Sequence, residues 1–220
     1  MKAVAIDGPA GAGKSTIAKA VAAKQQFIYV DTGALYRSIG LYAVRCGKDY
    51  TDGTQVVPLL PEISLQLRYV EGIQRVFLNG EDVSDLIRTP EIAMAASGVS
   101  AIPQVREFLF DLQRDMAKEN NVVMDGRDIG TVVLPDADVK IFLTASPEAR
   151  AHRRYDEHLA KGEKVSYDDI LQDVITRDYN DSHRAVAPLK QAEDAVLVDT
   201  TNLDLEQSIQ TVMKIVEEKI

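Results

Sequence analysis

A glycine-rich stretch near the amino terminus constrains the fold of this chain more than any other feature. It reads G-P-A-G-A-G-K-S over residues 8–15, and it follows an apolar run at residues 3–6 and Asp7. Residues 14–24 then carry apolar side chains at helical spacing. A glycine turn between a buried strand and a helix is typical of a parallel sheet, in which each strand leads into a helix that covers one face. The stretch therefore predicts an α/β fold that begins with a strand, a loop and a helix.

The rest of the chain repeats this alternation. Short apolar runs that predict buried strands lie at residues 3–6, 27–30, 122–124, 139–143 and 195–198. Because segments with helical patterns separate these runs, we expect one domain over residues 1–220, with a doubly wound, five-stranded parallel sheet and helices on both faces. Residues 31–121 are too long for a single crossover and predict an inserted subdomain. Within it, residues 64–69 alternate and can pair with 75–78 across Glu71-Gly72 as a small antiparallel hairpin.

Composition excludes several classes of function. The net charge of -9 argues against a general binder of nucleic acid or of anionic membranes, because such proteins carry a basic excess. No apolar run approaches the ~20 residues that a membrane span needs. The single cysteine, Cys46, cannot form an internal disulfide, as is common in a reducing compartment. We expect a cytoplasmic protein that binds neither membranes nor nucleic acid.

The glycine-rich stretch fits the phosphate-binding pattern G-x-x-x-x-G-K-[ST]. Glycines let successive backbone N–H groups point inward around an anion, and the following helix adds its positive amino-terminal end. Lys14 can bridge the outer phosphates, and Ser15 can ligate Mg²⁺. A chance glycine turn is the alternative, but the position between a strand and a helix favours a nucleoside triphosphate. The residues expected to bind it are Gly8, Pro9, Ala10, Gly11, Ala12, Gly13, Lys14, Ser15 and Thr16.

This phosphate-binding loop identifies the phosphate donor but not the reaction. Such loops occur in GTPases, motor ATPases, transporters and small kinases. An N-K-x-D motif, which reads guanine, is absent from the sequence. A small kinase is therefore favoured, and a nucleotide-dependent switch remains the alternative from another class.

A second polar stretch follows the predicted strand at 122–124. It reads D-G-R-D over residues 125–128. The carboxyl ends of parallel strands face the ligand crevice, so Asp125 is expected to orient the water shell of a metal, while Arg127 and Asp128 reach into the crevice. The alternative is an ordinary strand-ending turn, in which Asp and Gly are common.

A third candidate stretch follows the predicted strand at 27–30. There, Thr32 can offer a hydroxyl and Arg37 a guanidinium to an anion. The alternative is that Thr32 only starts a helix and that Arg37 is a solvated side chain.

Arginines toward the carboxyl terminus have helical spacing. Arg150, Arg153 and Arg154 are predicted to bring their heads to one face of a helix that begins at residue 147. Residues 150–184 hold seven Arg and Lys against eight Asp and Glu, so this segment is not a basic patch. Its arginines are either surface ion pairs or aimed at a ligand. The polar residues 162–164 between two predicted helices suit a lid.

Four motifs make a family resemblance specific. D-T-G-A-L-Y-R, D-G-R-D-I-G-T-V-V, R-A-H-R-R and H-R-A-V-A-P-L follow the phosphate-binding loop in this order, and the chain resembles bacterial cytidylate kinases from its first strand to its last. The resemblance implies a nucleoside monophosphate kinase with a P-loop core, a helical lid over residues 147–184 and an enlarged monophosphate-binding subdomain within 31–121. It implies ATP and Mg²⁺ as cofactors, CMP and dCMP as acceptors, and we expect a monomer.

The resemblance also implies roles for individual residues. Catalysis would fall to Lys14, Arg127, Arg153, Arg154 and Arg184, and the metal to Ser15 and, through water, Asp125. Thr32, Arg37, Arg127 and Arg184 would hold the acceptor phosphate; Ser97, Arg106 and Asp128 would read cytosine; Arg177 and Asp181 would lie near the ribose. UMP, AMP or a non-nucleotide acceptor remain alternatives.

Overall fold

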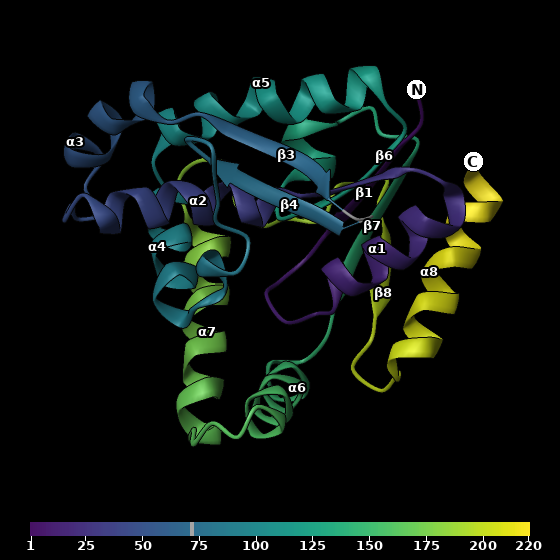
Figure 1. Ribbon diagram of the computed structural model, residues 1–220. Coiled ribbons are helices and arrows are strands. Elements are labelled where there is room, and N and C mark those ends of the chain that lie inside the picture. The colour runs from purple at the N-terminus through teal and green to yellow at the C-terminus, as the bar shows by residue number, and fades with distance from the viewer. Residues whose placement is uncertain (71–72) are drawn as a thin grey trace. The chain divides into compact units, whose positions relative to one another are not determined.

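The computed structural model describes residues 1–70 and 73–220 and divides into two compact units. The first unit contains Met1–Val30 and Met116–Ile220, and the second contains Asp31–Asp115. Figure 1 shows both and labels many of their helices and strands. Within residues 1–70 and 73–220, none of the helices combines the length and the apolar character that crossing a bilayer requires.

The first unit is built on a five-stranded sheet with the order β2-β6-β1-β7-β8. Its strands are β1 (Ala3–Asp7), β2 (Ile28–Asp31), β6 (Val122–Gly126), β7 (Val139–Thr144) and β8 (Val196–Asp199). β1 pairs in parallel with both β6 and β7, and β7 pairs in parallel with β8. Because helices cover its faces, the central strand is almost entirely apolar and buried. This confirms the predicted five-stranded parallel sheet.

The register of the central strands determines which loops meet. Asp7, the last residue of β1, is aligned with Gly126, the last residue of β6. Both strands therefore end at the same edge of the sheet. The glycine-rich loop after β1 and the D-G-R-D turn at the end of β6 emerge there side by side.

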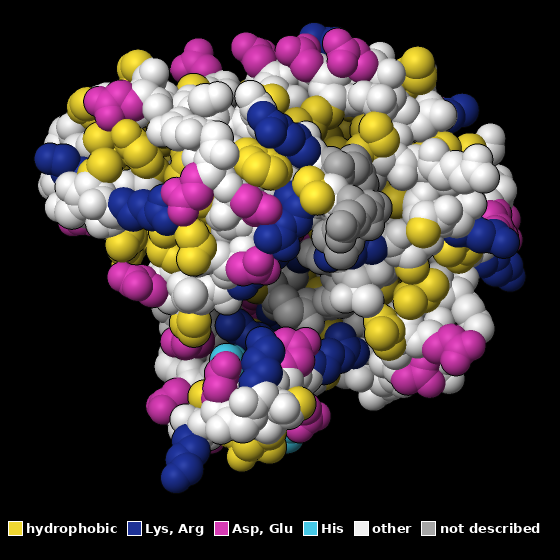
Figure 2. Space-filling view, viewed as in Figure 1, with side chains coloured by type: hydrophobic (Ala, Val, Ile, Leu, Met, Phe, Trp, Pro, Cys, Tyr) yellow, Lys and Arg dark blue, Asp and Glu magenta, His cyan; other side chains and the backbone are white. Residues whose placement is uncertain are grey.

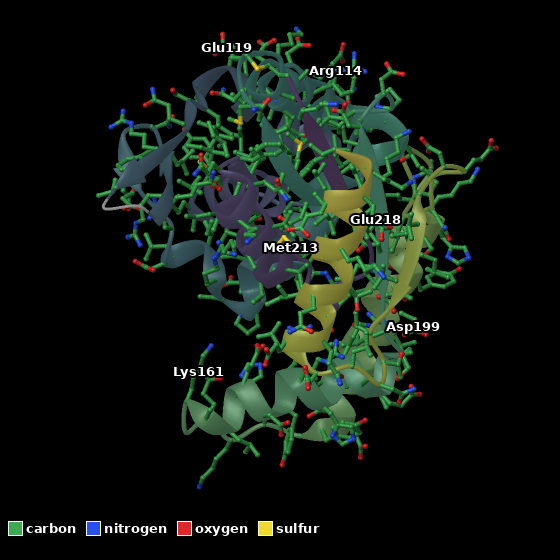
Figure 3. All side chains as sticks on the ribbon, turned by 90° about the vertical axis from the view of Figure 1, so that its right-hand side faces the viewer. Arg114, Glu119, Lys161, Asp199, Met213 and Glu218 are labelled. Atoms are coloured by element: carbon green, nitrogen blue, oxygen red, sulfur yellow. The ribbon has the colours of Figure 1, made fainter. Side chains whose placement is uncertain are left out.

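Two pairs of helices complete the first unit. α1 (Lys14–Gln25) packs against α8 (Leu205–Lys219), and both contribute to a core that includes Ile17 and Val212. Met213, labelled in Figure 3, packs against the same core. α6 (Pro147–Ala160) packs against α7 (Tyr167–His183), and Lys161 lies at the turn between them (Figure 3).

The starts of these helices follow the capping rules. Ser146 accepts a hydrogen bond from the backbone N–H of Ala149, and Asp204 forms a reciprocal capping box with Gln207. Ser and Asp are among the residue types that most often begin helices in this way.

The second unit combines helices with a three-stranded antiparallel sheet of order β3-β4-β5. The predicted hairpin is confirmed as β3 (Leu65–Val70) and β4 (Ile73–Leu78), although its predicted turn, Glu71-Gly72, lies outside the described residues. Asn79 and Gly80 both have positive φ and turn the chain into the short strand β5 (Glu81–Asp82), which sequence patterns did not predict. The helices are α2 (Thr32–Arg45), α3 (Gly53–Val56), α4 (Pro90–Ser100) and α5 (Pro103–Glu119), with 3₁₀ turns at Val57–Glu62 and Leu86–Arg88.

A separate hydrophobic core holds the second unit together. Its buried members include Leu35 and Ile39 of α2, Leu78 of β4 and Leu109 of α5. α2 packs closely on α4 at Gly40, where a Cβ would lie 3.0 Å from the Cβ of Ala95. The two units thus bury two distinct sets of apolar side chains.

Candidate active site

The glycine-rich loop joins β1 to α1 in a conformation that requires glycine. Gly8, Gly11 and Gly13 all have positive φ, and a Cβ at Gly8 would lie only 1.9 Å from the backbone oxygen of Leu143. Gly13 is the N-cap of α1, and among the described residues no side chain caps the backbone N–H groups of this helix start. These N–H groups and the positive end of the helix dipole suit a bound phosphate.

Lys14, the first residue of α1, is buried under the loop. Its ammonium group donates a hydrogen bond of 2.7 Å to the carbonyl oxygen of Pro9. Burial lowers the pKa of Lys14 well below its usual value, and the nearby guanidinium of Arg127 lowers it further. An anion beside Lys14 would oppose both effects, because it favours the charged lysine.

Ser15 and Asp125 bring two oxygen ligands together beside the loop. The Ser15 hydroxyl donates to one carboxylate oxygen of Asp125 at 2.9 Å, and the hydroxyl of Tyr29 donates to the other at 2.8 Å. Hydroxyl and carboxylate oxygens are the ligands that Mg²⁺ prefers, so this pair fits a magnesium ion that also contacts phosphates and water. Tyr29 orients the carboxylate, a role that sequence reasoning missed.

The D-G-R-D turn carries two charged side chains, Arg127 and Asp128. Arg127 contacts α7, and Asp128 lies near Arg184, the C-cap residue of α7. Arg127 Nε donates to Asp181 at 2.7 Å, and the Arg184 guanidinium lies 3.5 Å from Asp128. Burial alone would raise the pKa of Asp181, but Arg127, Arg177 and Arg184 outweigh it and hold the pKa below its usual value. The structure thus brings together five of the predicted site residues, Arg127, Asp128, Arg177, Asp181 and Arg184, with opposite charges paired.

Asp7 lies between the glycine-rich loop and the D-G-R-D turn and was not predicted as a site residue. Its carboxylate accepts hydrogen bonds from the backbone N–H groups of Ile129 (2.8 Å) and Gly130 (2.7 Å). Burial raises the pKa of Asp7 to about 6, against the opposing effect of these two N–H groups. The only sequence signal for it is a carboxylate at the end of a buried strand.

The arginines of α6 do not all point the same way. Arg150 and Arg154 both lie against Gly11, where a Cβ would be 3.4 Å from Arg150 Cβ and 3.7 Å from Arg154 Cδ. Arg153 instead donates to the hydroxyl and carbonyl oxygens of Thr200. The prediction of one common face is therefore wrong for Arg153, because positions 153 and 154 are ~100° apart around a helix.

The guanidinium of Arg150 is buried and forms hydrogen bonds within the protein. Only 2% of the residue is exposed, and its guanidinium donates to the carbonyl oxygens of Ala145 (2.8 Å) and Ala10 (3.0 Å) and to the carboxylate of Asp178. It therefore ties the glycine-rich loop to both α6 and α7. Acidic and basic side chains are mixed over the part of the surface where α6 lies (Figure 2), in keeping with the balanced charges of residues 150–184.

Thr32, Arg37, Ser97 and Arg106 belong to the second unit. Thr32 is the buried first residue of α2, directly after the N-cap Asp31. Burial would raise the pKa of Asp31, but Arg37 and Arg88 hold it below its usual value. Arg88, which donates to Asp31 at 2.9 Å, was not predicted.

The two base-reading candidates of this unit lie on α4 and α5. Ser97 is a half-buried residue of α4, and the buried Arg106 of α5 donates to the carbonyl oxygen of Ser100 at 3.2 Å. The guanidinium of Arg106 also lies 5.5 Å from the centroid of the Tyr36 ring. Sequence reasoning did not identify Tyr36.

Comparison with known proteins supplies the family. A family model described as "Cytidylate kinase" matches residues 4–218. The cytidylate kinase of Caldicellulosiruptor saccharolyticus is 49% identical over 96% of this chain and 94% of that protein. That of Carboxydothermus hydrogenoformans is 47% identical over 98% of this chain and 97% of that protein. A solved structure from Eubacterium ventriosum, titled as an uncharacterized protein, shares the fold alone, with a TM-score of 0.52 at 13% identity over 99% of each chain. With these matches, the chain belongs to the cytidylate kinase family of phosphotransferases.

Proposed function

We propose that this protein transfers the γ-phosphoryl group of Mg-ATP to CMP or dCMP, giving ADP and CDP or dCDP. The observation that carries the proposal is the pairing of a phosphate-binding loop with a buried arginine–aspartate network at the same edge of the sheet. The loop provides for a donor triphosphate. The network provides guanidinium groups for a second anionic substrate, which a nucleotide-dependent switch does not need.

Residues 8–16 would hold the ATP phosphates, with Lys14 at the outer phosphates. Ser15 and, through water, Asp125 would hold Mg²⁺, which supplies positive charge that stabilises the phosphates during transfer. The hydrogen bond between their oxygens supports this assignment.

The acceptor needs no catalytic base. A phosphate monoester has a second pKa of ~6, so the attacking oxygen of CMP is already ionised at neutral pH. None of the three histidines, His152, His158 and His183, is therefore assigned a role. The barrier comes from bringing two highly negative groups into line, so positioning and charge neutralisation are the catalysis. Lys14, Arg127, Arg154 and Arg184 are assigned to that task. Arg153 is assigned to it by the family resemblance and would have to leave Thr200 to reach the phosphates.

The acceptor assignments follow the family resemblance. Thr32, Arg37, Arg127 and Arg184 are assigned to the phosphate, Arg177 and Asp181 to the ribose, and Ser97, Arg106 and Asp128 to the base. Arg127 and Arg184 are supported by their carboxylate partners, which keep both guanidiniums oriented before a phosphate arrives. A carboxylate and an arginine complement the amino donor and the ring acceptors of cytosine.

A panel of acceptors tests the proposal. ADP release from Mg-ATP is measured with CMP, dCMP, UMP and AMP in turn. We expect CMP and dCMP to be preferred over UMP by at least about tenfold in kcat/KM, because uracil reverses the donor and acceptor at two positions. ADP release that does not respond to CMP, or that is as fast with UMP, contradicts the proposal.

The base-reading role of Asp128 has its own test. Asp128→Ala is expected to reduce the preference for CMP over UMP by about tenfold, since it removes the carboxylate proposed to accept from the cytosine amino group. Asp136→Ala, an exposed position in the same connection, serves as the control. An unchanged preference in Asp128→Ala refutes the assignment.

We also propose that the protein acts as a monomer in the cytoplasm, on free nucleotides rather than on nucleic acid. The net charge of -9 supports the last point. Light scattering in the presence and absence of CMP tests the monomer, and a stable dimer contradicts it.

A further inference from the structure

We infer that Asp7 is a positioning residue for the acceptor, because it holds the turn that carries Arg127 and Asp128. The inference deepens the proposed function and rests on it. Asp7 is assigned no contact with either substrate and acts through the backbone of the turn.

Both carboxylate oxygens of Asp7 are engaged by the same turn. Oδ1 accepts from the backbone N–H of Ile129 at 2.8 Å, and Oδ2 accepts from that of Gly130 at 2.7 Å. Asp7 is only 4% exposed, so water does not compete for these bonds. Two bonds to successive N–H groups fix both the position and the rotation of the peptide units that they join.

These peptide units directly follow the two charged side chains of the D-G-R-D turn. Asp128 precedes Ile129 and is the N-cap of a π-helical turn (Ile129–Val133), yet its side chain does not cap that turn. It points to Arg184 instead, while Arg127 reaches Asp181. A small rotation of the turn would therefore redirect the side chains at 127 and 128 together.

A carboxylate at position 7 is held by its hydrogen bonds and not by its burial. Burial penalises its charge, and the charged groups that act on it include Asp128, which is of the same sign, as well as Lys14 and Arg127. Lys140 also packs beside it at Gly130, where a Cβ would lie 3.2 Å from Lys140 Cδ and 3.3 Å from Asp7 Oδ2. A negative charge is unfavourable beside a site for phosphates. What the carboxylate offers, and an amide does not, is two acceptor oxygens aimed at two adjacent N–H groups.

Asp7 also joins the two halves of the site in the first unit. It is the residue immediately before Gly8, the first glycine of the phosphate-binding loop, and its side chain holds the acceptor turn. The same residue thus sets the spacing between the donor loop and the D-G-R-D turn.

The test compares Asp7→Asn with Asp138→Asn. Asn at position 7 keeps one acceptor and turns an NH₂ donor toward the other N–H, so one of the two bonds is lost. Asp138, which directly precedes β7, is a matched control, because its carboxylate accepts from the backbone N–H of Ala3 at 2.8 Å, at the opposite end of β1 from Asp7, and from Lys2. KM values for CMP, UMP and ATP are measured for the wild type and both variants.

We expect Asp7→Asn to raise KM for CMP about tenfold and to reduce the preference for CMP over UMP, with KM for ATP changed less than about twofold. Asp138→Asn should leave all three values unchanged. Unchanged KM for CMP in Asp7→Asn, or equal losses toward CMP and ATP, overturns the inference.

Gly130→Ala tests the same contact from the side of the turn, because the backbone N–H of Gly130 donates to Asp7. Its Cβ would press on Asp7 Oδ2, so we expect a smaller rise in KM for CMP without a rise for ATP. If Asp7→Asn does not fold, Gly130→Ala tests the inference alone. In that case, a KM for CMP equal to that of the wild type overturns the inference. A wild type that does not phosphorylate CMP refutes the proposed function and with it this inference, whereas an active wild type with unaltered variants refutes the inference alone.

Discussion

At the scale of single residues, the site is made of charges that are buried in balanced groups. Arg127 and Arg184 each face a carboxylate, and Lys14 lies within the field of Asp125 and Asp181. Asp7 differs from these carboxylates in that two neutral N–H groups are its hydrogen-bond donors. Burial therefore penalises its charge, as the raised pKa of Asp7 indicates.

The raised pKa of Asp7 predicts a dependence of stability on pH. An aspartate with a pKa of 3.8 when unfolded and about 6 when folded binds more protons in the folded state between these values. The free energy of unfolding therefore falls as the pH rises through this window, by up to about 3 kcal/mol. Asn at position 7 does not titrate, so urea unfolding at pH 4.5 and 7.5 should show the wild type losing stability relative to Asp7→Asn. If the difference in free energy of unfolding between the two proteins is the same at both pH values, or if the wild type gains stability at pH 7.5, the raised pKa of Asp7 is contradicted.

Glycine at position 8 is required by space as well as by φ. In Gly8→Ala the new Cβ would lie 1.9 Å from the backbone oxygen of Leu143, which belongs to β7 and cannot move aside. Gly80→Ala is the matched control, since Gly80 also has positive φ but has no described atom within 4 Å of the new Cβ. We expect thermal unfolding to report about 1–2 kcal/mol lost at Gly80 and clearly more at Gly8. Equal losses at the two positions would contradict the close contact with β7.

At the scale of elements, α6 and α7 are joined to the glycine-rich loop by Arg150. Arg150→Met removes the partner of Asp178 and two hydrogen bonds to carbonyl oxygens, so we expect a loss of about 3–5 kcal/mol in the free energy of unfolding. Lys214→Met, which breaks an exposed pair with Glu218 at 3.9 Å, should cost less than about 1 kcal/mol. Urea unfolding of both variants measures these changes in the free energy of unfolding. Similar small losses in the two variants would mean that the contacts of Arg150 do not stabilise the packing of α6 and α7 on the glycine-rich loop.

Sequence patterns predicted the elements better than the contacts between them. The five parallel strands, the glycine-rich loop and the β3–β4 hairpin follow from hydrophobic periodicity and turn residues, which are local signals. β5 was missed because two residues carry no periodicity. The π-helical turn at Ile129–Val133 was missed because it depends on Asp7, more than 120 residues earlier in the chain.

The same limit applies to side chains. Helical spacing indicated that the arginines of α6 share a face, but it could not reveal that Arg150 is buried against Ala10 and Asp178 while Arg153 reaches Thr200. Those partners come from loops and helices that only the folded chain brings together. The assigned roles of Thr32, Arg37, Ser97 and Arg106 still rest on the family resemblance and stay predictions.

At the scale of the whole molecule, two hydrophobic cores belong to two units. Ile6 in the first core and Ile39 in the second are buried to the same degree, at 0% and 1% exposure, so Ile6→Ala and Ile39→Ala form a matched pair. Each should cost about 2–5 kcal/mol. Hydrogen exchange should show reduced protection mainly in residues 1–30 and 116–220 for Ile6→Ala, and mainly in 31–115 for Ile39→Ala. Equal loss across the chain in both variants would mean that the units unfold as one.

In the proposed reaction, the γ-phosphoryl group passes from ATP to the phosphate of CMP. The most direct measurement follows γ-labelled ATP with the purified protein, Mg²⁺ and CMP, and separates the nucleotide products. We predict that the label appears in CDP, with one CDP formed for each ADP, and that ADP formation nearly stops when CMP is left out. Label released as free phosphate at the same rate with and without CMP would contradict this reaction.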